Sequence, residues 1–325
     1  MRTISATYRC SLFVFAIASL CTRRVWGDTE LAPGVHLLPG RFVKGTQPDG
    51  NTVILRGSKG LVVVDTGRHP EHTQGVIDFA RAAHLPVVAI VNSHWHLDHI
   101  GGNAMLRKAF PEVRVYASAA FADARKGFLA SYRAQLEDMV QKTPDPAAQK
   151  PWLAEIALID AGDALAPDEI VAASGERTLA GRRLRLQFED HAVTAGDLWV
   201  LDKATRVLVA GDLVTLPVPF LDTACPERWR VALDRLAKTD FVWLVPGHGA
   251  PMHRAQLNVY RKAFDSLLKC AASSQPKSSC IDGWMRDAGP LLTGEDPTFV
   301  RSLLDYYVDN SLRGDASRRA ALCRE

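Results

Sequence analysis

The chain has 325 residues, of which 47% are hydrophobic and 23% are charged. These values are ordinary for a soluble globular protein, and they exclude a collagen-like, coiled-coil or mostly disordered chain. The formal charge of +3 arises at the start of the chain, because residues 1–27 carry four arginines and no acidic residue, so the remainder carries −1. A chain whose remaining residues carry a net charge of −1 is not expected to bind nucleic acid.

The first 27 residues have the pattern of an export signal. Two arginines precede an apolar run at residues 11–20, and this run is shorter than the about 20 residues that a membrane-spanning helix needs. We therefore predict a signal peptide at residues 1–27, no stable membrane anchor after its cleavage, and a periplasmic or secreted mature protein. A membrane-anchored N-terminus is the alternative, because Arg23 and Arg24 follow the apolar run.

Strands and helices alternate along the first half of the chain. Runs rich in β-branched residues predict strands, with a hairpin between the second and third, at residues 31–38, 51–56, 61–65, 87–91 and 113–116. Apolar residues at helical spacing predict helices at residues 70–84, 103–110 and 119–141, the last ending at a Pro-rich linker. We expect this last stretch and the linker to form either a lid or groove wall, or part of the outer helical layer.

Predicted strands and helices also alternate along the second half of the chain. Strands are expected at residues 182–188, 198–201, 207–210 and 241–245, and helices at residues 227–237, 255–270 and 298–310. The rest of the chain after residue 271 reads as loops. Strands followed by helices in each half predict a layered α/β fold with sheet at its centre.

Four cysteines remain once the predicted signal peptide is removed, namely Cys225, Cys270, Cys280 and Cys323. An even number in an exported chain fits two disulfides, for which three pairings exist. We favour Cys270–Cys280, because it closes a short loop of Ser, Pro and Lys, and this leaves Cys225–Cys323. Four free buried thiols are the alternative.

The strongest chemical feature is the cluster of His94, His96, Asp98 and His99, which follows a predicted strand directly. Neutral imidazoles and a carboxylate are the ligands that zinc takes in proteins, and three histidines within six residues are improbable as a chance surface cluster. Trp95 lies inside the cluster, and we expect it to line the mouth of the site.

This His-x-His-x-Asp-His pattern resembles the signature of the metallo-β-lactamase fold superfamily. Residues 64–67, 210–213 and 245–249 are similar to the family's other motifs and occur in the same order, so the resemblance covers about residues 31–265. It implies an α/β (α+β) fold, specifically a four-layer αββα sandwich with a zinc site at one edge. We expect the domain to span residues 28–265 and a C-terminal helical extension at residues 266–325 to pack on it.

The resemblance also implies a set of metal ligands for one or two Zn²⁺ ions per chain. Asp98 also has the catalytic role of orienting the attacking water, whereas Asp65 is expected to support the metal loop through hydrogen bonds and not to bind metal. The first metal would be bound by His94 and His96, the second by Asp98, His99 and His248, and both by the bridging Asp212.

One position departs from the family pattern. Val193 stands where the family has a third histidine for the first metal, and His191 lies two residues earlier. Residues two apart on a strand share a face but lie about 6.6 Å apart, so His191 could ligate only if the backbone shifts or bulges. The alternatives are an incomplete first site with a labile or absent metal, or a ligand supplied by Asp190 or Glu189.

The resemblance predicts an exported, zinc-dependent hydrolase that uses a metal-activated hydroxide on an ester, lactone, thioester or amide bond of a small molecule. The leader, the Val-Asp-Thr-Gly start and the cysteine-bearing C-terminus are similar to the quinoprotein relay system zinc metallohydrolases, which implies a link to periplasmic quinoprotein dehydrogenases. The alternatives are a non-catalytic metal- or ligand-binding protein on this fold, a β-lactamase, and a di-iron oxidoreductase.

Overall fold

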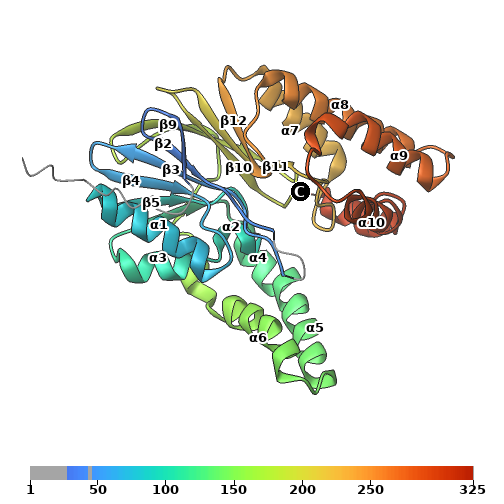
Figure 1. Cartoon of the computed structure of the whole chain (residues 1–325), viewed down its shortest axis with the longest axis horizontal. Helices are drawn as coiled ribbons and strands as arrows, with labels where there is room; N and C mark the ends of the chain where they lie inside the picture. The colour runs from blue at the N-terminus through green and yellow to red at the C-terminus, as the bar shows by residue number, and fades with distance from the viewer. Residues whose placement is uncertain (1–27, 43–45, 325) are drawn as a thin grey trace, which may run out of the picture.

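Two β-sheets lie face to face, with helices on the outer side of each (Figure 1). The computed structural model describes residues 28–42 and 46–324, so the predicted signal peptide at residues 1–27 lies outside the described residues. The layers follow the order helix, sheet, sheet, helix. The predicted α/β class and four-layer αββα sandwich are confirmed.

The first sheet contains the strands of the first half in sequence order: β1 (Thr29–Ala32), β2 (Val35–Leu38), β3 (Thr52–Gly57), β4 (Gly60–Val64), β5 (Val87–Val91), β6 (Arg114–Ala117) and β7 (Glu169–Ile170). Pairing is antiparallel from β1 to β4 and parallel from β4 to β7. The single strand expected at residues 31–38 is a hairpin instead, because Gly34, with φ of 70°, turns the chain between β1 and β2.

The second sheet has the strand order β12–β11–β10–β9–β8. Its members are β8 (Gly175–Leu179), β9 (Arg182–Glu189), β10 (Asp197–Asp202), β11 (Val207–Thr215) and β12 (Trp243–His248). All pairs are antiparallel except β11 with β12, which is parallel. Valine and leucine side chains of both sheets fill the space between them, and each buried side chain of this size contributes about 1.5–3 kcal/mol.

Four amphipathic helices form the outer layers. α1 (Pro70–Ala83) and α3 (Asn103–Ala109) cover the first sheet, and α7 (Pro226–Lys238) and α8 (Arg254–Ala271) cover the second. Proline in the first turn starts both α1 and α7, where the missing N–H costs no helical hydrogen bond.

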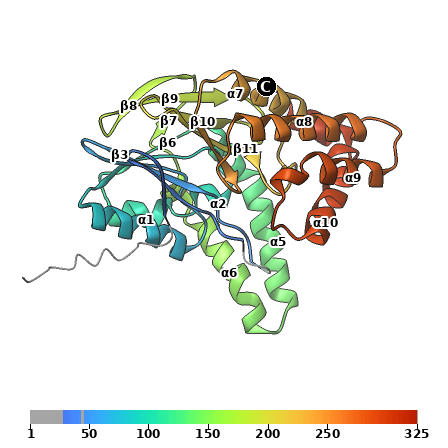
Figure 2. The ribbon, with the colours of Figure 1, turned by 45° about the horizontal axis from the view of Figure 1, so that its top comes forward.

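The helix expected at residues 119–141 is two helices, α4 (Ala120–Lys126) and α5 (Phe128–Lys142), because the chain bends at Gly127. The Pro-rich linker begins a further helix, α6 (Pro146–Asp160), whose first turn is capped by the Asp145 carboxylate. The short helix η1 (Gly162–Leu165) follows. Figure 2 shows α5 and α6 side by side, extending away from the sandwich.

The chain after α8 is largely helical, where only one helix was expected. Its elements are α9 (Lys277–Asp287), η2 (Gly289–Leu291), α10 (Pro297–Tyr307), the π-helix η3 (Val308–Leu312) and α11 (Ala316–Leu322). Trp284 and Leu304 of this segment are fully buried in the same apolar cluster as α7 and α8. The disulfides pair Cys225 with Cys323 and Cys270 with Cys280, as favoured from the sequence.

Within residues 28–42 and 46–324, no helix has the length and apolar character that crossing a bilayer requires.

Candidate metal centre

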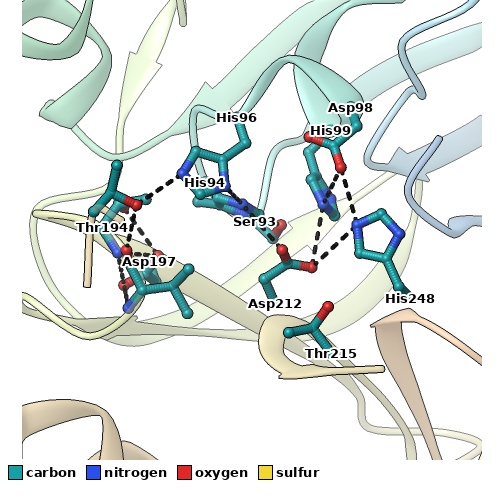
Figure 3. Close-up of polar contacts among 12 residues, drawn as sticks. Ser93, His94, His96, Asp98, His99, Thr194, Asp197, Asp212, Thr215 and His248 are labelled. Carbon is teal, nitrogen blue, oxygen red and sulfur yellow. Dashed lines mark hydrogen bonds and ion pairs between the residues drawn. The ribbon is translucent and has the colours of Figure 1, made fainter. Parts of the chain in front are cut away.

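All the predicted ligands except His191 meet at one edge of the sandwich, where strands of both sheets end (Figure 3). The loop after β5 and the short helix α2 (Leu97–Ile100) supply the ligands of the first sheet. Asp212 comes from the bent end of β11, and His248 is the last residue of β12. The second sheet therefore supplies the shared carboxylate and the last histidine.

The side chains form two groups whose ligand atoms lie within 4.8 Å of one another. Site 1 contains His94, His96 and Asp212, and site 2 contains Asp98, His99 and His248. Asp212 lies between them, because its Oδ2 is 3.8 Å from His94 Nε2 and its Oδ1 is 3.2 Å from His99 Nε2 and 3.6 Å from His248 Nε2. The carboxylate is therefore placed to serve both sites.

Hydrogen bonds fix which nitrogen of each site 1 histidine carries its proton. The Ser93 hydroxyl donates to Asp65 Oδ2, so it accepts from His94 Nδ1 at 2.9 Å and leaves His94 Nε2 as a lone pair. Similarly, the Thr223 hydroxyl donates to the carbonyl of Val193, so it accepts from His96 Nε2 at 2.9 Å and leaves His96 Nδ1 as a lone pair.

These two lone pairs face each other, since His94 Nε2 and His96 Nδ1 lie 2.8 Å apart. Burial lowers the pKa of His94 well below its usual value and that of His96 to about 4, so neither ring supplies a proton to the gap at neutral pH. Two opposed lone pairs repel unless a cation lies between or beside them, and two neutral imidazoles are a ligand pair that zinc accepts.

At site 2, the Asp65 carboxylate orients His99. Asp65 has a φ of 59°, and this unusual conformation turns its side chain toward the metal loop. Its oxygens accept from Ser93 N and Ser93 Oγ, both at 2.7 Å, and from His99 Nδ1 at 2.8 Å. His99 Nε2 therefore points at Asp212.

Site 2 brings three buried carboxylates close to its histidines. Burial disfavours the charged form of His99, but the carboxylates of Asp212, Asp65 and Asp98 raise its pKa well above the usual value. Burial likewise disfavours the Asp98 anion, whereas the charge of His99 and a hydrogen bond from His248 lower the pKa of Asp98 well below the usual value. A divalent cation would balance these carboxylates.

Three buried side-chain atoms of the described residues form no hydrogen bond, and two of them belong to the centre, His99 Nε2 and Asp212 Oδ1, which lie 3.2 Å apart. Both face the space between the sites, and a buried polar atom left without a partner costs about 1–3 kcal/mol. Together with the opposed lone pairs of site 1, they show that the residues present fit divalent metal ions.

Glycines let the backbone approach the ligands closely. A Cβ atom at Gly247 would collide with Asp212 Oδ1, and one at Gly50 would lie 2.6 Å from the His99 ring. The sequence therefore leaves both positions without a side chain beside the ligands.

The structure does not bring His191 to either group of ligands in the described part of the chain. His191 has a φ of 52°, and its Nδ1 lies 2.5 Å from Asp190, which also pairs with Arg228 at 2.7 Å. Glu189 is engaged by Trp199 and Arg235 instead. None of the three residues proposed to replace the third histidine therefore joins site 1.

Val193, at the position of the missing histidine, is fully buried in the apolar cluster beneath α7 and α8. Its carbonyl accepts the Thr223 hydroxyl that also contacts His96, and its N–H donates to Asp197. Thr223 was not anticipated from the sequence, because it is 127 residues from His96 and no local pattern marks it. Arg68, whose Nη2 lies 3.5 Å from Asp98 Oδ1, was missed for the same reason.

Comparisons with known proteins agree with this geometry. A family model described as the metallo-beta-lactamase superfamily matches residues 45–271. A linear primary-alkylsulfatase from Pseudomonas sp. (strain ATCC 19151) is 29% identical over an alignment of 233 residues, and the match covers 61% of this chain and 41% of that protein. The chain thus spans about two fifths of the length of that relative.

Two solved structures share the fold. A metallo-beta-lactamase from Pontibacter korlensis superposes with a TM-score of 0.56 at 21% identity, covering 73% of this chain and 98% of that one. The inverting sec-alkylsulfatase Pisa1 from Pseudomonas sp. superposes with a TM-score of 0.55 at 22% identity, covering 75% of this chain and 42% of that one.

Proposed function

Because the chain belongs to the metallo-beta-lactamase superfamily, whose members are hydrolases, we propose that it hydrolyses an ester bond of a small molecule at a centre of two zinc ions. The observation that carries this proposal is the pair of opposed imidazole lone pairs, 2.8 Å apart, next to a carboxylate that reaches both sites. We assign zinc to both sites, because zinc commonly binds neutral histidines and carboxylates in proteins.

In this proposal, His94, His96 and Asp212 hold the metal of site 1, and Asp98, His99 and His248 hold that of site 2, with Asp212 shared. His191 is left out of the ligand set, because Asp190 holds its ring. Site 1 then has two imidazoles and one shared carboxylate.

A bound zinc ion would lower the pKa of a water toward about 7 and polarise the bond to be cleaved. In this proposal Asp98 orients the attacking water, since it is a buried carboxylate of site 2. Its Oδ2 lies 2.9 Å from His248 Nε2 and its Oδ1 faces Arg68. Asp65 and Thr223 act through the histidines that they hold.

Sulfate esters of alkyl alcohols are the first substrates to test, since two of the similar proteins are named alkylsulfatases. The two disulfides support a periplasmic or secreted location, because such bonds persist in oxidising compartments. The link to quinoprotein dehydrogenases stays a prediction from sequence resemblance.

The test is metal content by elemental mass spectrometry together with turnover of a panel of esters, sulfate esters, lactones, thioesters and β-lactams. We expect two zinc ions per chain, loss of one in His94→Ala, and no change in His191→Ala. Turnover should stop on chelation and return with zinc. Purified protein that retains iron, or binds zinc without turning over any member of the panel, would contradict the proposal.

A further inference from the structure

A groove lies on the outer face of the second sheet, between β9, β10 and the C-terminal end of α7. Its volume is about 640 Å³, within the range of about 300–1,000 Å³ that small-molecule sites occupy. Trp199 and Leu201 of β10 belong to the apolar cluster beneath α7, and their partners on β9 are Gln187 and Arg185. Because directly paired residues point to the same side of a sheet, Gln187 and Arg185 also face outward and line the groove.

The groove concentrates positive charge. Among the described residues that line it, five are basic and one is acidic, although the chain after residue 27 carries a net charge of −1. The basic residues are Arg185, Lys203, Arg206, Arg235 and Lys238, and the acidic residue is Asp240. A concave surface lined by one sign of charge raises the local concentration of ions of the opposite sign. Anions are therefore the class of ligand that the groove favours.

Three of these bases are paired with carboxylates. Glu189, which is buried, accepts from Arg235 Nε at 2.9 Å and from the Trp199 indole at 3.0 Å, so it fixes both side chains. The other two pairs are Lys203 with Glu176 at 3.1 Å and Arg206 with Asp240 at 2.9 Å. These contacts hold the walls of the groove in place and leave two of its bases without a carboxylate.

Those two bases, Arg185 and Lys238, come from different walls of the groove, β9 and α7. Within residues 28–42 and 46–324, neither forms an ion pair, and both side chains are exposed. Arg185 donates to the amide oxygen of Gln187 at 2.8 Å, and its guanidinium carbon lies 6.0 Å from the centre of the Trp199 ring. Both positive charges are therefore available to a ligand that enters the groove.

The groove is separate from the metal centre. β12 begins at Trp243 and ends at His248, and Trp243 pairs with Val207, the residue that follows Arg206. Since a strand rises about 3.3 Å per residue, this end of the sheet lies about 16 Å from His248. The described residues that line the groove include no histidine or cysteine, so the groove is suited to binding and not to a second reaction.

We propose that this groove binds a compact polyanion that carries two or more phosphate or sulfate groups. Arg185 and Lys238 each receive one anionic group, because guanidinium and ammonium groups form charge-assisted hydrogen bonds to such oxygens. A long polyanion such as a nucleic acid is disfavoured. Beyond one Debye length, about 8 Å at physiological salt, it would meet a chain whose net charge is negative. The inference does not depend on the proposed reaction.

The test measures binding of pyrenetetrasulfonate, a compact fluorescent polyanion, to the zinc-loaded full chain by fluorescence anisotropy. Loss of one exposed charge contact costs up to about fivefold in affinity, so Arg185→Gln and Lys238→Gln should each weaken binding by about 2–5-fold. The two residues lie on separate elements, so the double variant should bind about 4–25-fold more weakly. Competition with fructose bisphosphate and with benzenedisulfonate then separates a preference for phosphate from a preference for sulfate-like groups.

The matched control is Lys108→Gln, because Lys108 is an exposed base in the last turn of α3, as Lys238 is in the last turn of α7. This variant should bind pyrenetetrasulfonate as the parent does, and so should His94→Ala, which alters the metal centre alone. Absence of binding to the parent, equal binding to the parent and the double variant, or loss of binding in His94→Ala would overturn the inference. Displacement by an octa-aspartate peptide but by neither small anion would also overturn it, because the occupant would then be an acidic protein segment.

Discussion

Replacing Asp65 by asparagine should weaken metal binding at site 2, although Asp65 is not itself a ligand. One of its oxygens accepts from Ser93 N, and the other accepts from both Ser93 Oγ and His99 Nδ1. An asparagine keeps one acceptor and places an NH₂ group against the second pair of donors. The His99 tautomer that points a lone pair at the metal is then no longer favoured.

The size of the effect follows from this loss of orientation. Removing a hydrogen-bond partner behind a ligating histidine costs about 10–100-fold in metal affinity, or about 1.4–2.7 kcal/mol. Asparagine tolerates the left-handed conformation that Asp65 adopts, with φ of 59°, so Asp65→Asn changes the side chain without straining the backbone. Alanine at this position would add such strain.

The assay is a competition titration with a chromogenic zinc chelator, run alongside thermal unfolding. The control is Asp202→Asn, because Asp202 is equally buried but accepts from Arg182 and Thr205, away from the metal ligands. We expect Asp202→Asn to lower stability and leave zinc affinity unchanged. Zinc affinity that is the same in Asp65→Asn and the parent protein would refute the reasoning.

Three further predictions concern the same centre and its support. Thr223→Val should lower the affinity of site 1 for metal by about 10-fold or more, because His96 Nε2 loses its hydrogen-bond acceptor. A titration followed by native mass spectrometry would show that site 1 loses its metal before site 2 does. Removing metal by chelation should lower the unfolding free energy by about 2.7 kcal/mol for each site, relative to protein at a free metal concentration of 100 Kd, as scanning calorimetry can check. Replacing Cys225 and Cys323 together by serine should cost up to about 4.7 kcal/mol, because the bond closes a loop of 98 residues, and limited proteolysis should then cleave the C-terminal helices first.

The sequence allowed the sandwich and most of the centre to be predicted because the signals are local. His94, His96, Asp98 and His99 lie within six residues of the chain, and a ligand pattern of that density needs no knowledge of the fold. Asp212 and His248 were predicted only through motif order, since a single aspartate in a turn carries no signal of its own.

The parts that could not be predicted depend on contacts between distant segments. Thr223 acquires its role only when the loop after β11 folds back on the metal loop. The position of the His191 side chain depends on its contact with Asp190. Asp190 in turn pairs with Arg228 of α7, which comes near it only in the folded chain. The break at Gly127 is local instead, and it interrupts a stretch whose apolar periodicity alone predicts one continuous helix.

The position of the centre has a consequence for the order in which the protein matures. The first sheet carries His94, His96, Asp98 and His99, but the shared Asp212 and the last ligand His248 belong to the second sheet. Neither half of the chain holds all the ligands of either site, so a complete site exists only once the two halves have docked. A bound ion would then link the two separately built sheets, and its binding energy would oppose their separation.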